Sequence, residues 1–462
     1  MSETPVSADV VVVGAGLSGL YAAREVLRAG LEPIVLEADD RVGGRILTQQ
    51  VAPGVDVEIG AQWIGDTHHR MRALAAELGV DTFAQFEEGE ATYELLGAPV
   101  QRENDFHGMH ATELTALDQA LAELDRLSQQ VPLDAPWDAE HAAEWDAITA
   151  AQWLAAQQLP PVAERLLEIC TVGILAVPMA EVSLLDMLYN LQTCGVGAQL
   201  FAESEGGAQT TRFVGGSSRI PQALADQLGE RVRLGQPVML IEHTPESVTV
   251  HCRGGLVVRA RRVIVALAPT LGARIMYDPP LPGVRDQLTQ RMPQASAMKA
   301  FLTYDEPFWR ANGLSGQLIS DLGPSRMSND TSPADASYGQ LLLFLEGEQA
   351  RTFGRWPEAE RRAALIAEAV RHFGPRAAEP THYVDGEWSD RQWTRGCYNA
   401  NMGPLVWTNF GRALTPPIGP IHWASTETAT HWSGYMEGAV DAADRAAGEV
   451  IRRLELVERR PE

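Results

Sequence analysis

Three glycines near the start of the chain, with an acidic residue downstream, could bind the phosphates of a dinucleotide. They occur in the stretch Gly14-Ala15-Gly16-Leu17-Ser18-Gly19. In this spacing Gly14 permits a tight turn, Gly16 lets the backbone approach a pyrophosphate, and Gly19 lets a helix pack closely on a strand. The N–H groups at a helix N-terminus attract phosphate charge. Glu37 follows at the distance where an acidic side chain accepts hydrogen bonds from ribose hydroxyls.

A second glycine pair lies just beyond, in Asp40-Arg41-Val42-Gly43-Gly44-Arg45. Its backbone amides and the two guanidinium groups could reach the same pyrophosphate. The sequence therefore predicts a dinucleotide site built from two glycine turns.

The elements around these turns form a strand–helix–strand unit. Residues 10–13 are a β-branched run, residues 20–30 have helical periodicity, and residues 33–37 form a second short strand. Strand-like runs return at 231–242, 248–252, 256–266 and 418–424, and a last helix covers about 434–456.

A second set of elements interrupts the first. Residues 83–209 are predicted to be mostly helical, with amphipathic segments at 111–129 and 163–175, and a further helix follows Pro357. Strands are predicted at 297–304 and 338–345, and the polar, Gly/Pro-rich residues 321–337 between them are expected to be a surface loop.

Because the chain leaves the dinucleotide layer and returns to it twice, we predict an α/β fold of two interleaved, discontinuous domains. A Rossmann-type domain would comprise residues 1–80, 211–288 and 390–462. An α+β substrate-binding domain would comprise residues 81–210 and 289–389.

Composition and charge narrow the function classes. The 462 residues carry 37 Lys+Arg against 61 Asp+Glu, a net charge of −24, which argues against nucleic acid and anionic membranes as partners. No run approaches the length of a membrane span and the N-terminus has no leader-like segment, so we expect a soluble, cytoplasmic protein.

Cysteine and histidine spacing predicts no metal site. Cys170, Cys194, Cys252 and Cys397 include no C-x-x-C pair and make neither a zinc site nor a disulfide framework. The pair His68-His69 has no further ligand at suitable spacing, so we interpret it as a solvated turn.

The order of strand, glycine turn, Glu37 and residues 41–45 resembles the FAD-binding start of the flavin amine oxidases, a family that includes monoamine, polyamine and L-amino-acid oxidases. Trp388, Gly396-Cys397-Tyr398 and residues 426–439 closely resemble the corresponding stretches of the monoamine oxidases. Residues 60–63, 213–216, 278–282, 299 and 306–310 extend the resemblance over essentially the whole chain, which looks like a soluble bacterial monoamine oxidase.

The resemblance implies three catalytic residues. Tyr398 and Tyr435 match the two tyrosines that sandwich the substrate amine in front of the flavin. Lys299 matches the lysine that hydrogen-bonds a water next to flavin N5 and assists reoxidation by O2.

The resemblance also implies an FAD site, with residues on both sides of the chain's midpoint. The cofactor-binding candidates are Gly14, Gly16, Gly19, Glu37, Arg45, Gly60, Trp63, Val238, Trp388, Cys397, Glu427 and Met436. Cys397 matches the cysteine that joins the flavin 8α-methyl in covalently flavinylated members, and the alternative is a buried free thiol. Ser425 departs from the glycine that many relatives have, which puts the local backbone path in question.

The substrate-pocket candidates are Gln209, Ile174, Ile319 and Phe344. The implied function is an FAD-dependent oxidase of primary or secondary amines, with aromatic or apolar monoamines favoured, giving an imine and then an aldehyde or ketone while O2 becomes H2O2. The alternatives are an L-amino-acid oxidase, a diamine or polyamine oxidase of the same fold, and a flavin-binding protein without turnover. A homodimer is common among relatives.

Overall fold

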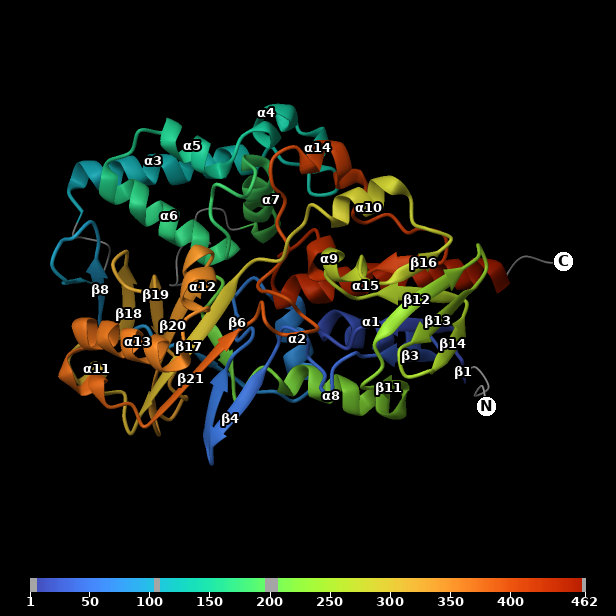
Figure 1. Cartoon of the computed structure of the whole chain (residues 1–462), viewed down its shortest axis with the longest axis horizontal. Helices are drawn as coiled ribbons and strands as arrows, with labels where there is room; N and C mark the ends of the chain where they lie inside the picture. Colours follow the sequence, from blue (N-terminus) through green and yellow to red (C-terminus); the bar gives the residue numbers. More distant parts are fainter. Residues whose placement is uncertain (1–5, 104–108, 196–206, 459–462) are drawn as a thin grey trace.

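The computed structural model describes residues 6–103, 109–195 and 207–458. Residues 1–5 and 459–462 of the predicted Rossmann-type domain lie outside this part. So do residues 104–108 and 196–206 of the predicted helical stretch. A five-stranded parallel sheet forms the centre of one half of the molecule (Figure 1). Its strands, in order across the sheet, are β11 (Val232–Arg233), β3 (Pro33–Leu36), β2 (Val10–Val13), β15 (Arg262–Val265) and β22 (Ile421–Trp423).

Helices cover one face of this sheet. All four residues of β2 are buried. Val10 and Val12 face a core shared with Leu20 and Val440 from the helices. Apolar side chains on successive strand residues point to opposite faces, so a wholly apolar strand needs a cover on each side. The helices of this face are α1 (Leu17–Arg28), α2 (His69–Glu77), α8 (Arg219–Leu228) and α15 (Met436–Glu458).

A second sheet covers the other face, where Val11 and Val13 meet Ile241 and Val250. Its strands, in order, are β1 (Val6–Ser7), β14 (Val257–Ala260), β13 (Val248–Cys252), β12 (Val238–His243) and β16 (Met276–Asp278). Together the two sheets and the helices form the Rossmann-type half of the molecule.

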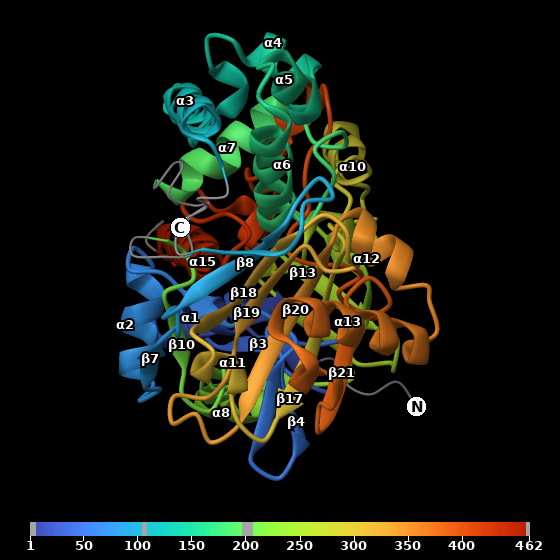
Figure 2. The same cartoon turned by 90° about the vertical axis from the view of Figure 1, so that its left-hand side faces the viewer.

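A seven-stranded mixed sheet forms the other half (Figures 1 and 2). In order its strands are β21 (His382–Glu387), β17 (Ala297–Tyr304), β20 (Gly339–Glu346), β19 (Met327–Asp330), β18 (Leu314–Ser320), β8 (Glu90–Glu94) and β9 (Gln101–Glu103). Helices α11 (Phe308–Ala311) and α13 (Glu358–Phe373) pack on one face.

A layer of helices lies above both halves in Figures 1 and 2. Its core contains Leu124, Leu167, Leu188 and Trp407. The helices are α3 (Ala111–Ser128), α4 (Ala142–Ala147), α5 (Ala150–Ala156), α6 (Pro161–Leu175), α7 (Leu184–Cys194), α10 (Gly283–Thr289) and α14 (Val406–Phe410).

Short elements connect these units. The strands β6 (Trp63–Ile64), β10 (Thr211–Phe213) and β7 (Thr82–Ala84) form a small antiparallel sheet, and β4 (Thr48–Ala52) pairs with β5 (Val55–Glu58). Two further short helices are α9 (Pro269–Gly272) and α12 (Glu348–Phe353).

The predicted α/β fold with two interleaved domains is confirmed, since each large sheet is assembled from segments far apart in the sequence. The exact domain bounds stay a prediction. Two predicted runs divide between sheets: 231–242 becomes β11 and β12, and 256–266 becomes β14 and β15.

Two local predictions were wrong. Residues 321–337 are not a surface loop, because β19 runs through them inside the seven-stranded sheet and residues 328–332 are buried. The segment has a composition typical of a loop, but the side chains of Ser328, Asp330 and Thr331 make hydrogen bonds in the interior. For the stretch 83–209 the helical prediction fails only in the first part, which contains the end of β7 and the strands β8 and β9, whereas the residues from Ala111 to Cys194 are mostly helical.

Candidate functional site

A cavity extends from the first glycine turn to strands β17 and β20 of the seven-stranded sheet. Most of the predicted site residues line it: Gly14, Gly16, Glu37, Arg45, Gly60, Trp63, Ile174, Gln209, Lys299, Phe344, Trp388, Cys397, Tyr398, Tyr435 and Met436. Gly19, Val238, Glu427 and Ile319 are not among the residues that line it.

The glycine turn has the geometry that a pyrophosphate requires. Gly14 has a φ of +102°, which favours glycine. A Cβ on Gly19 would lie 2.0 Å from the Gly14 carbonyl oxygen, so helix and strand could not pack as they do. A Cβ on Gly16 would meet nothing closer than 4.0 Å. Gly16 precedes α1 and no side chain caps the helix, so the first-turn amides can receive a phosphate.

Glu37 stands at the other side of this turn. Its carboxylate accepts hydrogen bonds from the backbone amides of Ala15 at 2.6 Å and Asp39 at 2.9 Å. Burial raises the pKa of Glu37. Val238 lies on β12, two residues beyond Gln236, whose amide donates to the Glu37 carbonyl oxygen at 2.7 Å. These contacts place Glu37 where ribose hydroxyls of a bound nucleotide would meet it.

The two arginines of the second glycine turn donate hydrogen bonds to other groups of the protein. The Arg41 guanidinium donates to the carbonyl oxygens of Val42, Gly44 and Ile46, and so holds the turn in shape. Arg45 donates to Glu427 at 2.7 and 3.2 Å. Burial alone would raise the pKa of Glu427, but the Arg45 guanidinium lowers it below the usual value.

Lys299 lies on β17 between apolar strand neighbours and lines the cavity. Its ammonium donates to the carbonyl oxygens of Gly60 at 2.7 Å and Glu58 at 3.2 Å, and to Oε1 of Gln62 at 3.0 Å. It also lies 5.2 Å from the centre of the Trp63 ring. Burial lowers the pKa of Lys299 to about 7. A buried ammonium is costly unless it is partnered, and three oxygens serve that purpose here.

Hydrogen bonds hold Tyr398 at its backbone and at its hydroxyl group. Arg45 donates to its carbonyl oxygen at 2.6 Å, and its hydroxyl donates to Oε1 of Glu346 at 2.9 Å. Enclosure in the cavity, followed by the Glu346 carboxylate, raises the pKa of Tyr398 well above its usual value. The phenol therefore stays protonated and acts as a donor.

Tyr435 lines the same cavity from the segment before α15. Its ring lies 5.0 Å from that of Trp432 and 5.8 Å from that of His68, both edge to face. His68 is fully buried, so the predicted solvated turn is wrong for this residue, although His69 is exposed. Burial lowers the pKa of His68 to about 3, so its ring is neutral. It supports the tyrosine by packing.

Cys397 and its neighbours form the wall beside Lys299. The thiol is buried, and burial raises its pKa to about 11. Trp388 donates from its indole nitrogen to the Ile59 carbonyl oxygen at 3.0 Å. Ser425 has extended backbone angles, φ −81° and ψ 155°, which any residue adopts, so the departure from glycine leaves the path intact.

Apolar side chains line the part of the cavity nearest Tyr398. Phe344 and Trp63 approach to 5.9 Å between ring centres, and Ile174 at the end of α6 lines the same region. Ile319 instead packs against the helical layer.

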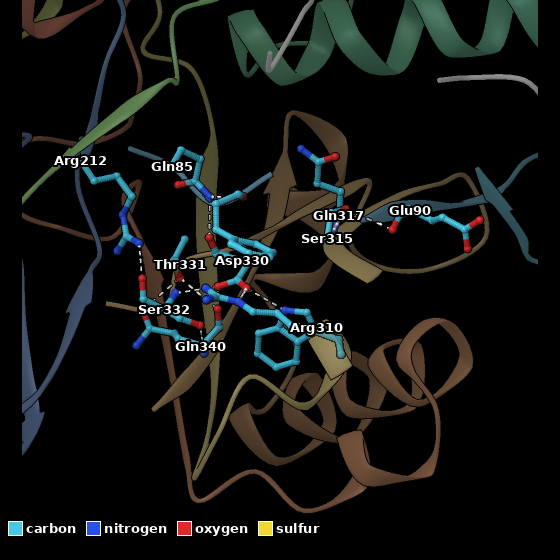
Figure 3. A network of polar contacts seen from close by, with 12 residues as sticks. Gln85, Glu90, Arg212, Arg310, Ser315, Gln317, Asp330, Thr331, Ser332 and Gln340 are labelled. Atoms are coloured by element: carbon cyan, nitrogen blue, oxygen red, sulfur yellow. Dashed lines mark hydrogen bonds and ion pairs between the residues drawn. The ribbon is translucent and has the colours of Figure 1, made fainter. Parts of the chain in front are cut away.

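The Trp63 ring is anchored by a polar network behind it. Trp63 donates to Oε1 of Gln85 at 2.9 Å, and Gln85 donates to the Asp330 carbonyl oxygen at 2.6 Å. Figure 3 shows how Gln85 and Arg310 converge on Asp330, with Arg212 reaching Ser332 nearby. This network joins the cavity wall to β19.

Sequence reasoning missed four residues that contact the predicted ones, Gln62, His68, Gln85 and Glu346, and two that line the cavity with them, Asn190 and Cys194. A signal was available for Glu346, because this carboxylate directly follows the apolar run 341–345 of β20, a strand that is buried throughout.

The described residues contain no group of three or more His, Cys, Asp or Glu side chains placed to hold a metal ion. None of their helices combines the length and apolarity needed to span a bilayer.

Comparison with known proteins shows the family of the chain. Residues 17–451 match the family model described as flavin containing amine oxidoreductase. The chain is 36% identical to a probable flavin-containing monoamine oxidase A of Dictyostelium discoideum, over 96% of this chain and 98% of that protein. It is also 36% identical to the human amine oxidase [flavin-containing] B, over 96% and 86% of the two chains.

Solved structures show the same likeness. A wild-type putrescine oxidase bound to putrescine superposes with a TM-score of 0.94 at 32% identity, covering 97% of this chain and all of that one. Cyclohexylamine oxidase from Brevibacterium oxydans gives a TM-score of 0.92 at 33% identity, covering 97% and 99%. The glycine turns, Glu37 and the cavity beyond them fit FAD. The chain therefore belongs to the flavin-containing amine oxidoreductases, and it is an FAD-dependent amine-oxidising enzyme.

Proposed function

We propose that this enzyme oxidises small apolar or aromatic monoamines, primary or secondary, with O2 as electron acceptor. When bound, FAD supplies the oxidant that takes a hydride equivalent from the carbon bearing the amine, so that the imine hydrolyses to an aldehyde or ketone and O2 becomes H2O2. The observation that carries the proposal is the charge distribution of the cavity lining.

The described carboxylates in the lining are Glu37 and Asp39, both at the nucleotide end. The described guanidinium groups are Arg41 and Arg45, and the contacts of both are to the protein itself. Among the described residues, the cavity lining around Tyr398 thus contains no carboxylate for a second ammonium and no free guanidinium for a substrate carboxylate, and the nearby Glu346, which is not part of the lining, accepts the hydroxyl of Tyr398. An apolar amine satisfies such a region best.

In this proposal Tyr398 and Tyr435 are the walls that orient the amine by their π-faces, and the low polarity around them favours the neutral amine over the ammonium. Lys299 assists the reaction with O2. Gln209, Ile174 and Phe344 shape the space for the substrate's apolar part.

Diamine oxidation is the second candidate, because the structural likeness to putrescine oxidase is high. A peroxide-coupled assay of the purified holoenzyme separates the two. We expect turnover of phenylethylamine, benzylamine, tyramine or cyclohexylamine, with kcat/KM for putrescine and for L-phenylalanine at least about tenfold lower. Preference for putrescine would replace the monoamine proposal with the diamine one, and bound flavin that no amine bleaches would overturn both.

Oligomeric state, location in the cell and O2 use are separate proposals. We propose a cytoplasmic homodimer, to be checked by light scattering and by cell fractionation. Peroxide formed in step with aldehyde would establish O2 as the acceptor.

A further inference from the structure

Glu346 is a carboxylate that the fold places beside the cavity without making it part of the lining. It is the last residue of β20, 1% exposed, and pairs with Ala297 of β17, two residues before Lys299. Gly347 follows with a φ of +57°, and a Cβ there would lie 3.3 Å from both Pro178 and Val172. The strand end is therefore rigid, and so is the origin of the Glu346 side chain.

The carboxylate of Glu346 accepts a hydrogen bond from the hydroxyl of Tyr398 at 2.9 Å. Hydrogen bonds to a carboxylate are stronger than neutral ones. The backbone of Tyr398 is held separately, since Arg45 donates to its carbonyl oxygen and the amide of Cys397 donates to the Ala295 carbonyl oxygen at 3.1 Å. The tip of the ring is therefore fixed by Glu346 and its base by another part of the chain.

We propose that Glu346 is a positioning residue for amine oxidation, which holds the ring of Tyr398 in the orientation that presents its face to the substrate. The inference rests on the proposed role of Tyr398 as a wall of the amine site. The second torsion of a tyrosine is broad on its own, so a fixed acceptor at the hydroxyl narrows the ring's orientations. Small misplacements of groups around a reacting centre cost one to two orders of magnitude in rate.

A stability cycle tests the contact without relying on turnover. The variants are Glu346→Leu, Tyr398→Phe and the double variant. Each single change leaves one buried polar partner unsatisfied, whereas the double change removes both. We expect each single variant to lower the Tm of the holoenzyme and the double variant to lose clearly less than the sum. Additive losses would show that the two side chains do not act together and would overturn the proposal.

A kinetic cycle tests the function of the contact. In anaerobic stopped-flow experiments with benzylamine, we expect Glu346→Leu to lower the rate constant of flavin bleaching about tenfold or more. Glu346→Gln keeps an acceptor oxygen and should stay within about threefold of the wild type. Glu346→Leu should add little to Tyr398→Phe, because the hydroxyl is already absent.

Tyr435→Phe provides the matched control, since Tyr435 is the other tyrosine of the cavity and has no described contact with Glu346. Its effect should combine additively with that of Glu346→Leu. A Glu346→Leu enzyme that bleaches at the wild-type rate, or that is equally non-additive with both tyrosines, would overturn the proposal. Loss of bleaching in the wild type would instead refute the proposed function, while the stability cycle would still report on the contact.

Discussion

Arg45 and Glu427, which are 382 residues apart in the sequence, form a two-point ion pair at 2.7 and 3.2 Å beside the cavity. The same Arg45 nitrogen that meets Glu427 also donates to the carbonyl oxygen of Tyr398, and Glu427 accepts the amide of Ala400 at 3.3 Å. The second glycine turn is thereby tied to the segment that carries Cys397 and Tyr398.

Glu427→Gln is expected to lower the free energy of unfolding of the apoprotein by about 3 kcal/mol at pH 7, because it leaves the Arg45 charge without its partner in a mostly buried place. The folded-state pKa of Glu427 is below its usual value, so the carboxylate contributes stability above about pH 4.5, and this contribution is lost as the pH falls further. Denaturant unfolding should show the gap between variant and wild type narrowing in acid. Glu306→Gln, in the exposed pair with Arg376, should change little.

Substitutions at two nearby glycines should have different effects, one on folding and the other on FAD binding. Gly19→Ala places a Cβ 2.0 Å from the Gly14 carbonyl oxygen and should prevent stable folding. Gly16→Ala has open space within the protein and should fold as an apoprotein with near wild-type Tm. Its methyl group would occupy the place of the pyrophosphate, so FAD affinity should fall at least about a hundredfold. Equal FAD affinity of Gly16→Ala and wild type, by fluorescence titration, would contradict this assignment.

Lys299→Met should slow the reaction of reduced flavin with O2 about a hundredfold and affect amine oxidation less, because it removes the positive charge beside the cavity. The lowered pKa of about 7 means that Lys299 is an ammonium below pH 7 and neutral above it. The reoxidation rate constant of the wild type should therefore fall as the pH rises through 7, and that titration should be absent in the variant.

The pKa of Lys299 can be measured directly. Since the chain contains no other lysine, protein labelled with 15N at the lysine side chain gives a single ammonium signal in NMR. A pKa near 10.5 in the apoprotein would contradict the lowered value.

Cys397 should carry the flavin as a thioether, because its buried thiol lines the cavity beside Lys299. After acid denaturation, the yellow colour should stay with the precipitated wild-type protein and move to the supernatant in Cys397→Ala. The native variant should still bind FAD through the glycine turns. Yellow supernatant from the wild type would show that the thiol is free.

Local sequence determined much of this protein. The glycine spacing, the apolar run before it and Glu37 predict the dinucleotide turn, because the residues that form this turn lie within about thirty positions of one another in the sequence. The match of residues 396–398 and 426–439 to the family placed Tyr398 and Tyr435, which do line the cavity. Strand 297–304 was predicted with the bounds that the structure has.

Only the tertiary structure decided which partners those residues meet. The oxygen acceptors around Lys299, the carboxylate at the Tyr398 hydroxyl and the aromatic rings packed on His68 come from segments up to 367 residues away in the sequence. The polar residues of β19 have the composition of a loop, yet the sheet buries them because Asp330 gains donors from Trp309 and Arg310 at 2.8 and 2.7 Å. Local propensity cannot show such compensation, since the free energy of a buried polar group depends on partners that only the folded chain brings within hydrogen-bond distance.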